Sequence, residues 1–164
     1  MASSRTSALL FTFLVAAAAL WIPAECAGPQ LTLFVTDDAL NPEAAACDGS
    51  TFGGLCPYRS YVSDSTEKQV GYVSGFCSFV IPYQADSSFE QICYFTFFFG
   101  TNPDTVVDSI SVQGHFTSAD GNLLSIVGGT GKYTGAKGYN KKTFASSGGE
   151  GDRYSTYQHE LYLM

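Results

Sequence analysis

Charged residues are scarce in this 164-residue sequence, at 14% of the chain, and acidic residues outnumber basic ones, so the net charge is −7. A chain with so few positive charges is a poor partner for nucleic acid or for an anionic membrane surface. It also has no run of like charges and no internal repeat of solenoid length. The sequence therefore predicts no nucleic-acid partner.

Histidine is rare as well, and His115 and His159 lie far apart in the sequence. Because disulfides explain the cysteines better than a metal does, we expect no metal site. There is no G-x-S-x-G motif to support a hydrolase triad and no N-x-Ser/Thr sequon for N-glycosylation. The sequence predicts that the protein works without a cofactor.

Long apolar runs are missing except at the N-terminus, where Ala8 to Ile22 is apolar but too short to span a membrane comfortably. Small residues before Ala27 offer a cleavage site, so residues 1–26 are predicted to be a secretory signal peptide. An uncleaved anchor is the alternative. No second apolar span follows, so we expect a secreted, extracellular protein with one domain over residues 27–164 and no stable membrane span.

Five cysteines suit an oxidising compartment poorly, but cleavage after Cys26 leaves four, with three possible pairings. One pairing is geometrically natural, because Cys77 and Cys93 fall on consecutive predicted strands where they can face each other across a ladder. Cys47 and Cys56 would then close a small loop in an irregular N-terminal segment.

Aromatic residues, in contrast, are abundant: the chain has 13 Phe and 10 Tyr. Alternation of apolar and polar residues, bounded by Gly, Pro and Asn, predicts β-strands rather than helices. The expected strands cover residues 31–36, 58–62, 70–81, 90–99, 108–116, 123–127, 139–144 and 153–164. Strands so spaced, with glycine-rich corners, predict an all-β fold: a closed, eight-stranded antiparallel β-barrel with room for one small ligand.

The strand at 90–99 is apolar on both faces, which indicates either that it is buried on both sides or that one face lines a cavity and the other packs a partner. The glycine-rich run at 128–138 invites comparison with a phosphate loop. Such a loop needs a helix after its basic residue, and no helical pattern follows Lys132. We interpret these glycines as positions where the sheet bends or two backbones approach closely.

Three motifs resemble the allene oxide cyclase and dirigent superfamily. They are SVQG at 111–114, VGGTGKY at 127–133 and GAKGY at 135–139, where Lys137 replaces the arginine of dirigent proteins. The resemblance extends from about Val70 to Phe144. It implies an eight-stranded barrel that commonly assembles as a homotrimer.

The resemblance to allene oxide cyclases implies three pocket positions. Cys77 matches a pocket cysteine, Phe116 stands where those enzymes have a tyrosine, and Arg59 falls near a pocket asparagine. The first strand carries no matching glutamate, and the secretory leader differs from that of a plastid enzyme.

The resemblance to dirigent proteins agrees better, because those proteins are secreted and hold phenolic radicals or quinone methides in an aromatic pocket. Their aspartate near the end of the first strand implies an acid role for Asp37 or Asp38. A carboxyl group at the mouth of an apolar cavity has a raised pKa and can exchange a proton with a phenol. The alternative is that both are solvated turn residues. Arg59, Tyr94 and Lys132 are secondary candidates.

The sequence thus predicts a barrel that binds a small hydrophobic molecule, phenolic or oxylipin-like, and steers its stereoselective cyclisation or coupling. The alternative is a non-catalytic ligand-binding or defence protein on the same barrel. The predicted catalytic residues are Asp37, Asp38 and Arg59. The predicted substrate-binding residues are Cys77, Tyr94, Phe95, Phe97 and Phe116.

Overall fold

The computed structural model describes residues 28–38, 50–82, 84–86, 88–150 and 154–164. The predicted signal peptide (1–26) and Cys47 lie outside these residues. Within the described ranges, no helix is both long enough and apolar enough to cross a membrane.

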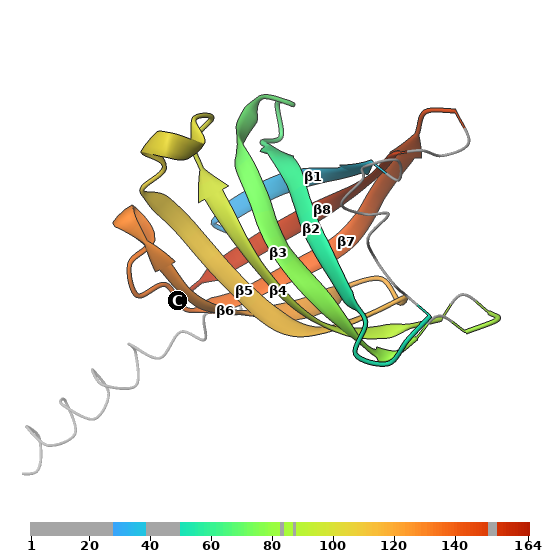
Figure 1. Ribbon diagram of the computed structural model, residues 1–164. Coiled ribbons are helices and arrows are strands. Elements are labelled where there is room, and N and C mark those ends of the chain that lie inside the picture. The colour runs from blue at the N-terminus through green and yellow to red at the C-terminus, as the bar shows by residue number, and fades with distance from the viewer. Residues whose placement is uncertain (1–27, 39–49, 83, 87, 151–153) are drawn as a thin grey trace, which may run out of the picture.

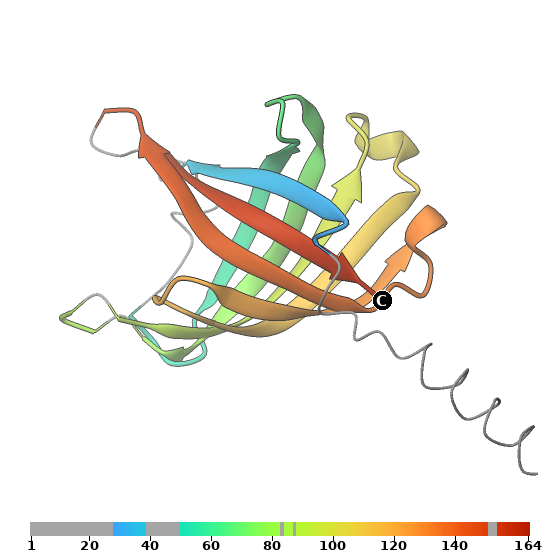
Figure 2. The same ribbon diagram turned by 180° about the vertical axis from the view of Figure 1, so that it is seen from behind.

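Eight strands follow one another and close an antiparallel barrel in which β1 also pairs with β8 (Figures 1 and 2). This confirms the predicted fold class. The strands are β1 (Leu31–Asp38), β2 (Leu55–Ser63), β3 (Gln69–Ile81), β4 (Glu90–Phe99), β5 (Asp108–Thr117), β6 (Asn122–Thr130), β7 (Gly138–Gly148) and β8 (Tyr154–Leu163). Two short 3₁₀ helices, η2 (Pro103–Thr105) and η3 (Gly131–Tyr133), lie in the connections.

The main difference from the sequence prediction is the length of β7, because the strand was expected to end at residue 144 and continues through residues 145–148. Ser147 pairs with Ser155 and Gly148 with Tyr154 on β8, across a register shift that follows Phe144. Ladder hydrogen bonds to β8 therefore hold a segment whose composition disfavours strand.

Apolar side chains fill the interior at the barrel end that carries the C-terminus. Alternate residues of each strand point inward, and in this region they are almost completely buried. They include Leu33, Val35, Val73, Phe97, Ile110, Val112, Ile126 and Leu161. Burial of each such side chain contributes about 1.5–3 kcal/mol, so this half of the barrel is a packed core.

A disulfide joins Cys77 on β3 to Cys93 on β4, where the two residues are direct partners in the ladder. This confirms the predicted pairing. Cys56, opposite Cys77 on β2, is disulfide-bonded as well. Its expected partner, Cys47, lies outside the described residues.

Glycine allows close backbone approach between β3 and β4. A Cβ atom on Gly75 would lie 2.0 Å from the carbonyl oxygen of Tyr94. The glycine-rich corner after β6 is also structural: Gly131 has φ +58°, and the Lys132 amide donates a hydrogen bond to Asp108 Oδ1 at 3.0 Å. The three-residue η3 then ends at Tyr133, so this corner lacks the helix of a phosphate loop.

Candidate functional site

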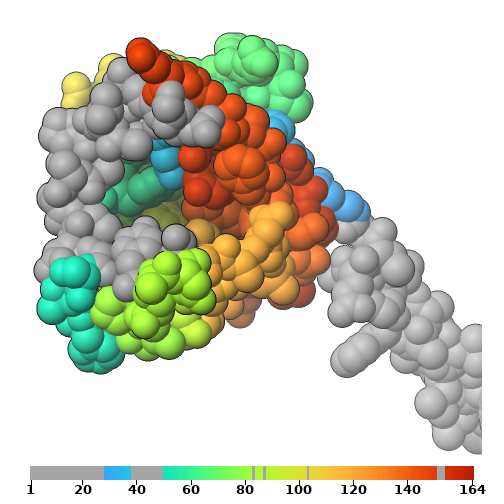
Figure 3. Space-filling model, turned by 90° about the vertical axis from the view of Figure 1, so that its right-hand side faces the viewer, coloured from blue at the N-terminus to red at the C-terminus, as the bar shows by residue number. Residues whose placement is uncertain are grey.

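A cavity of about 440 Å³ opens at the barrel end opposite the packed core, beside the β5–β6 hairpin. Figure 3 views this end and shows the hollow, with atoms in the colours of β1 and β2 visible inside it. The described lining consists of Phe89, Phe116, Thr117, Ser118, Ala119, Asp120, Asn122, Lys142, Phe144 and Tyr157. Four of these ten residues are aromatic, and Lys142 is the basic residue among them.

Side chains along β7 and β8 alternate between the two faces of the sheet, and this alternation places Lys142 and His159 inside the barrel. Lys142 is the ladder partner of His159, and Phe144 is the partner of Tyr157. The Phe144 and Tyr157 rings meet edge to face, with centroids 5.9 Å apart. Both strands thus present one aromatic and one ionisable residue to the interior.

Lys142 is 7% exposed, and its Nζ lies 3.8 Å from the ring centroid of Tyr157 and 4.4 Å from that of Phe116. Both distances allow a cation–π contact. Burial lowers the pKa of Lys142 from 10.5 to about 8, and the charge of Asp37 acts in the opposite direction. The amine can therefore gain or lose a proton near neutral pH.

Asp37 and Tyr58 form a hydrogen-bonded pair, in which the Tyr58 hydroxyl donates to Asp37 Oδ1. Burial raises the pKa of Asp37, and the Lys142 charge and the Tyr58 hydrogen bond partly offset that rise. Burial and the charge of Asp37 raise the pKa of Tyr58 well above 10. Tyr58 therefore keeps its proton, and Asp37 is the member of the pair that titrates.

The Asp37–Tyr58 pair also has a structural role. Among the described residues, β1 and β2 share only two ladder pairs, at Phe34 and Val35. Beyond them the Tyr58–Asp37 bond, and a hydrogen bond from the Ser60 hydroxyl to the Thr36 carbonyl oxygen, join the two strands. The Asp37 carboxyl group is thus held in place beyond the last ladder pair between β1 and β2.

A second buried pair lies beside Lys142. Asn140 Nδ2 donates a hydrogen bond to His159 Nδ1 at 3.0 Å, and the His159 ring packs edge to face on Phe97, with centroids 5.1 Å apart. Burial, followed by the Lys142 charge, lowers the pKa of His159 well below 6.5. The imidazole is therefore neutral with its proton on Nε2, so it does not add a positive charge to the site.

Some of the predicted site residues come together at this end of the barrel. Asp37 points inward, Phe116 lines the cavity, and Phe95 lies 5.2 Å from the Tyr58 ring, centroid to centroid. Phe97 is buried deeper, in the core. The backbone of Asp38 pairs with Tyr154, and its side chain lies outside what the structure describes.

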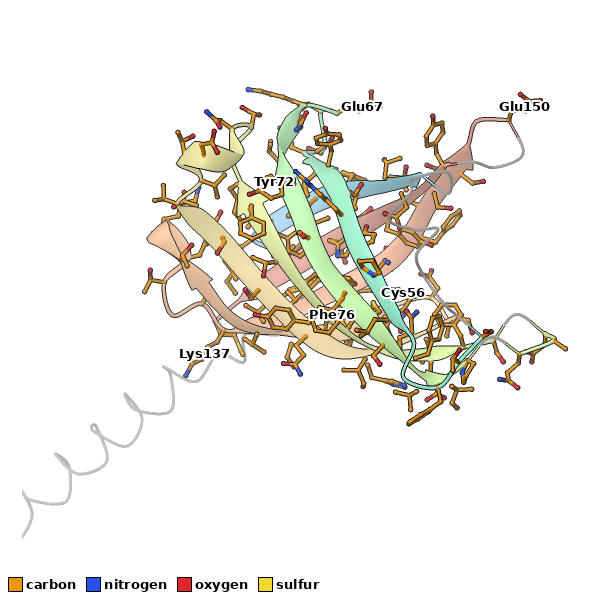
Figure 4. The ribbon with its side chains drawn as sticks, in the orientation of Figure 1. Cys56, Glu67, Tyr72, Phe76, Lys137 and Glu150 are labelled. Carbon is orange, nitrogen blue, oxygen red and sulfur yellow. A yellow bond between two sulfur atoms is a disulfide. The ribbon has the colours of Figure 1, made fainter. Side chains whose placement is uncertain are left out.

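Other predicted site residues lie away from the cavity. Arg59 is on the outer surface, its guanidinium 5.8 Å from the Tyr72 ring centroid. Tyr94 is 38% exposed on the outer face, beside Phe76. Figure 4 shows Tyr72 and Phe76 along β3. Both placements follow from parity, since these residues alternate with inward neighbours.

Two further candidates are engaged elsewhere. Cys77 has no free thiol, because its sulfur is in the disulfide. Lys132 follows the C-terminal end of β6, while the cavity adjoins the N-terminal end of that strand, and Lys132 Nζ lies 3.6 Å from Asp108 Oδ2. Among the described residues, no group of three or more His, Cys, Asp or Glu side chains is placed to hold a metal ion.

Sequence reasoning missed Lys142, Tyr58 and Tyr157 as site residues. One signal was available for Lys142: Lys141 and Lys142 are adjacent in a barrel strand, so one of the two must face the interior. Tyr58 carried no such signal, because its role depends on its position next to Asp37.

The model of the dirigent-like protein family matches residues 32–164, and a comparison with curated proteins finds no match. The pterocarpan synthase dirigent proteins GePTS1 and PsPTS1 have similar structures. GePTS1 has a TM-score of 0.61 at 18% identity, over 81% of this chain and 84% of that chain. PsPTS1 has a TM-score of 0.62 at 18% identity, over 82% and 92%.

A structure of pyocyanin demethylase is also similar, with a TM-score of 0.54 at 21% identity, over 82% of this chain and 98% of that chain. At such identities the structural likeness shows the shared barrel fold. The family model covers nearly all of the barrel from β1 to the C-terminus. The chain therefore belongs to the dirigent-like protein family.

Proposed function

We propose that this is a secreted protein that binds a small hydrophobic molecule, phenolic or oxylipin-like, inside its barrel and steers the stereoselective cyclisation or coupling of that molecule without a cofactor. The observation that carries the proposal is the aromatic cavity of about 440 Å³, which shares the barrel interior with the Asp37–Tyr58 pair. Its volume lies in the range of small-molecule sites, about 300–1,000 Å³.

Catalysis would come mainly from holding the reacting atoms in one near-attack geometry between the aromatic walls. Asp37 would assist as an acid or base, because its raised pKa brings it closer to the value at which a carboxyl group exchanges protons efficiently. Tyr58 would keep the carboxyl group in place. Two structural neighbours carry enzyme names, pterocarpan synthase and pyocyanin demethylase, which supports an active role for the barrel interior.

Secretion and assembly are part of the proposal. The apolar N-terminal segment and the disulfide-bonded Cys56, Cys77 and Cys93 suit an oxidising compartment. Exposed Phe76, Ile92 and Tyr94 give the outer face of β3 and β4 an apolar surface, which suits contact with further copies in a homotrimer.

Replacing Asp37 with Asn tests the catalytic role. A cyclase or coupling protein should lose turnover or product enantiomeric excess while keeping its affinity for phenolic ligands, because the amide cannot exchange the proton. Asp104→Asn, on exposed η2 far from the cavity, is the matched control. Unchanged turnover and enantiomeric excess in Asp37→Asn would contradict the catalytic role.

The second candidate is a non-catalytic ligand-binding or defence protein that uses the same cavity. One observation favours it: Asp37 is not among the described residues that line the cavity. Chiral chromatography of coupling products, formed with and without the protein, separates the two. A binding protein leaves the enantiomer ratio unchanged.

A further inference from the structure

The cavity contains a basic side chain, Lys142, that forms no ion pair with any residue the structure describes. Lys142 lines the cavity and is 7% exposed, and no described residue gives its Nζ a hydrogen bond or an ion pair. Its neighbour Lys141, in contrast, pairs with Glu160 on the outer face at 3.7 Å. Two consecutive lysines therefore differ completely in their electrostatic partners.

An ammonium group buried without a counter-ion costs free energy, and the two ring faces that Lys142 contacts compensate only part of that cost. Asp37 is near enough for the two charges to influence each other's pKa, but the two groups form no ion pair. The cavity, however, borders the amine directly and has room for a guest. A ligand oxygen with a negative charge would supply the missing partner.

We infer that Lys142 binds an anionic oxygen of the ligand, so that the cavity selects amphiphilic molecules with an apolar body and one carboxylate or phenolate group. The apolar body packs against Phe89, Phe116, Phe144 and Tyr157, and the charged oxygen lies on Nζ. The inference rests on the proposed ligand-binding cavity and narrows its ligand class.

The other ionisable groups around Lys142 are compatible with this role. Among the described residues they are Asp37 from β1, Tyr58 from β2, Tyr157 and His159 from β8, and Asp120 from the β5–β6 hairpin. Tyr58 and His159 are neutral near pH 7. The Asp120 carboxylate accepts a hydrogen bond from the Phe144 amide at 2.8 Å. Lys142 is thus the cation that an anion in this cavity would meet.

Calorimetry on the mature protein at pH 7, with two matched probe pairs, tests the inference. The carboxylate pair is 3-phenylpropanoate and 3-phenylpropanol; the phenolate pair is 4-nitrophenol and 4-nitroanisole. We expect the anionic member of at least one pair to bind about tenfold more tightly than its neutral analogue. For a phenolate ligand, visible absorbance should also show that binding promotes ionisation of 4-nitrophenol.

Lys142→Met should abolish the preference while the neutral probes still bind, Lys142→Arg should keep it, and Lys141→Met is the matched control. In the wild-type protein, Lys142 loses its charge as the pH rises through about 8, so the preference for 3-phenylpropanoate should fall over that range. This measurement tests the inference even if the Lys142 variants fail to fold. Equal binding within both pairs, or a preference that survives in Lys142→Met, would overturn the inference alone. Failure of all four probes to bind would also count against the proposed function.

Discussion

At the scale of single residues, Lys142 links stability to function. Because burial lowers its pKa from 10.5 to about 8, the unfolded chain binds more protons than the folded chain between these two values. The free energy of unfolding should therefore rise with pH across this window, by about 3 kcal/mol in total. Below pH 8 the full cost of the buried charge is present.

Lys142→Met should remove this cost. We expect the variant to be more stable than the wild type by about 1–3 kcal/mol at pH 7, after allowance for the lost cation–π contacts. The gain should shrink as the pH rises from 8 to 10. Urea denaturation at several pH values measures both effects. A variant less stable than the wild type at pH 7 would show that Lys142 is a structural residue.

Tyr58→Phe tests the hydrogen bond that holds Asp37. The bond lowers the pKa of Asp37, so its loss should raise that pKa further and cost about 1.5–3 kcal/mol of stability. Carboxyl ¹³C titration by NMR reads the pKa directly. A pKa that falls, or one that does not move, would show that the Tyr58 hydroxyl does not stabilise the carboxylate.

Strand parity decides which face of the barrel each predicted site residue takes, whereas the roles of Tyr58 and Lys142 depend on tertiary contacts. Asp37 and Phe116 were predicted to be site residues and both reach the cavity end. Tyr94 has the aromatic character of a pocket residue, but its parity places it outside. Tyr58 gave no signal of a site role, because its role depends on Asp37 of β1; for Lys142 the sequence indicated only that it or Lys141 faces the interior.

At the scale of elements, a disulfide and two close glycine contacts join the strands of the β3–β4 pair. Gly75→Ala should destabilise the protein by more than about 2 kcal/mol, because the new Cβ would lie 2.0 Å from a backbone oxygen. Gly128→Ala is the matched control, as its Cβ would meet nothing within 4 Å. Equal denaturation midpoints for the two variants would contradict this account.

Most elements were predictable from sequence because period-2 alternation and glycine, proline or asparagine boundaries marked them. The second half of β7 was not, since Ser146, Ser147 and Gly148 resemble a loop by composition. Their conformation is decided by β8, which continues alongside them. The composition of a short segment does not show whether a partner strand will pair with it.

At the scale of the whole molecule, the exposed outer face of β3 and β4 predicts self-association. Light scattering during size-exclusion chromatography should give three times the monomer mass for the wild type. Phe76→Glu should yield monomers, because a charge in an apolar interface is costly. Leu123→Glu, at an exposed position on β6, is the control. A monomeric wild type would contradict the prediction.

The central claim is that the closed barrel is half core and half ligand chamber, and a crystal structure of the mature protein soaked with 3-phenylpropanoate tests it most directly. We expect one molecule in the cavity, with its ring between Phe116 and Tyr157 and its carboxylate within hydrogen-bond distance of Lys142 Nζ. Side chains occupying that space, or a ligand bound only on the outer surface, would contradict the account.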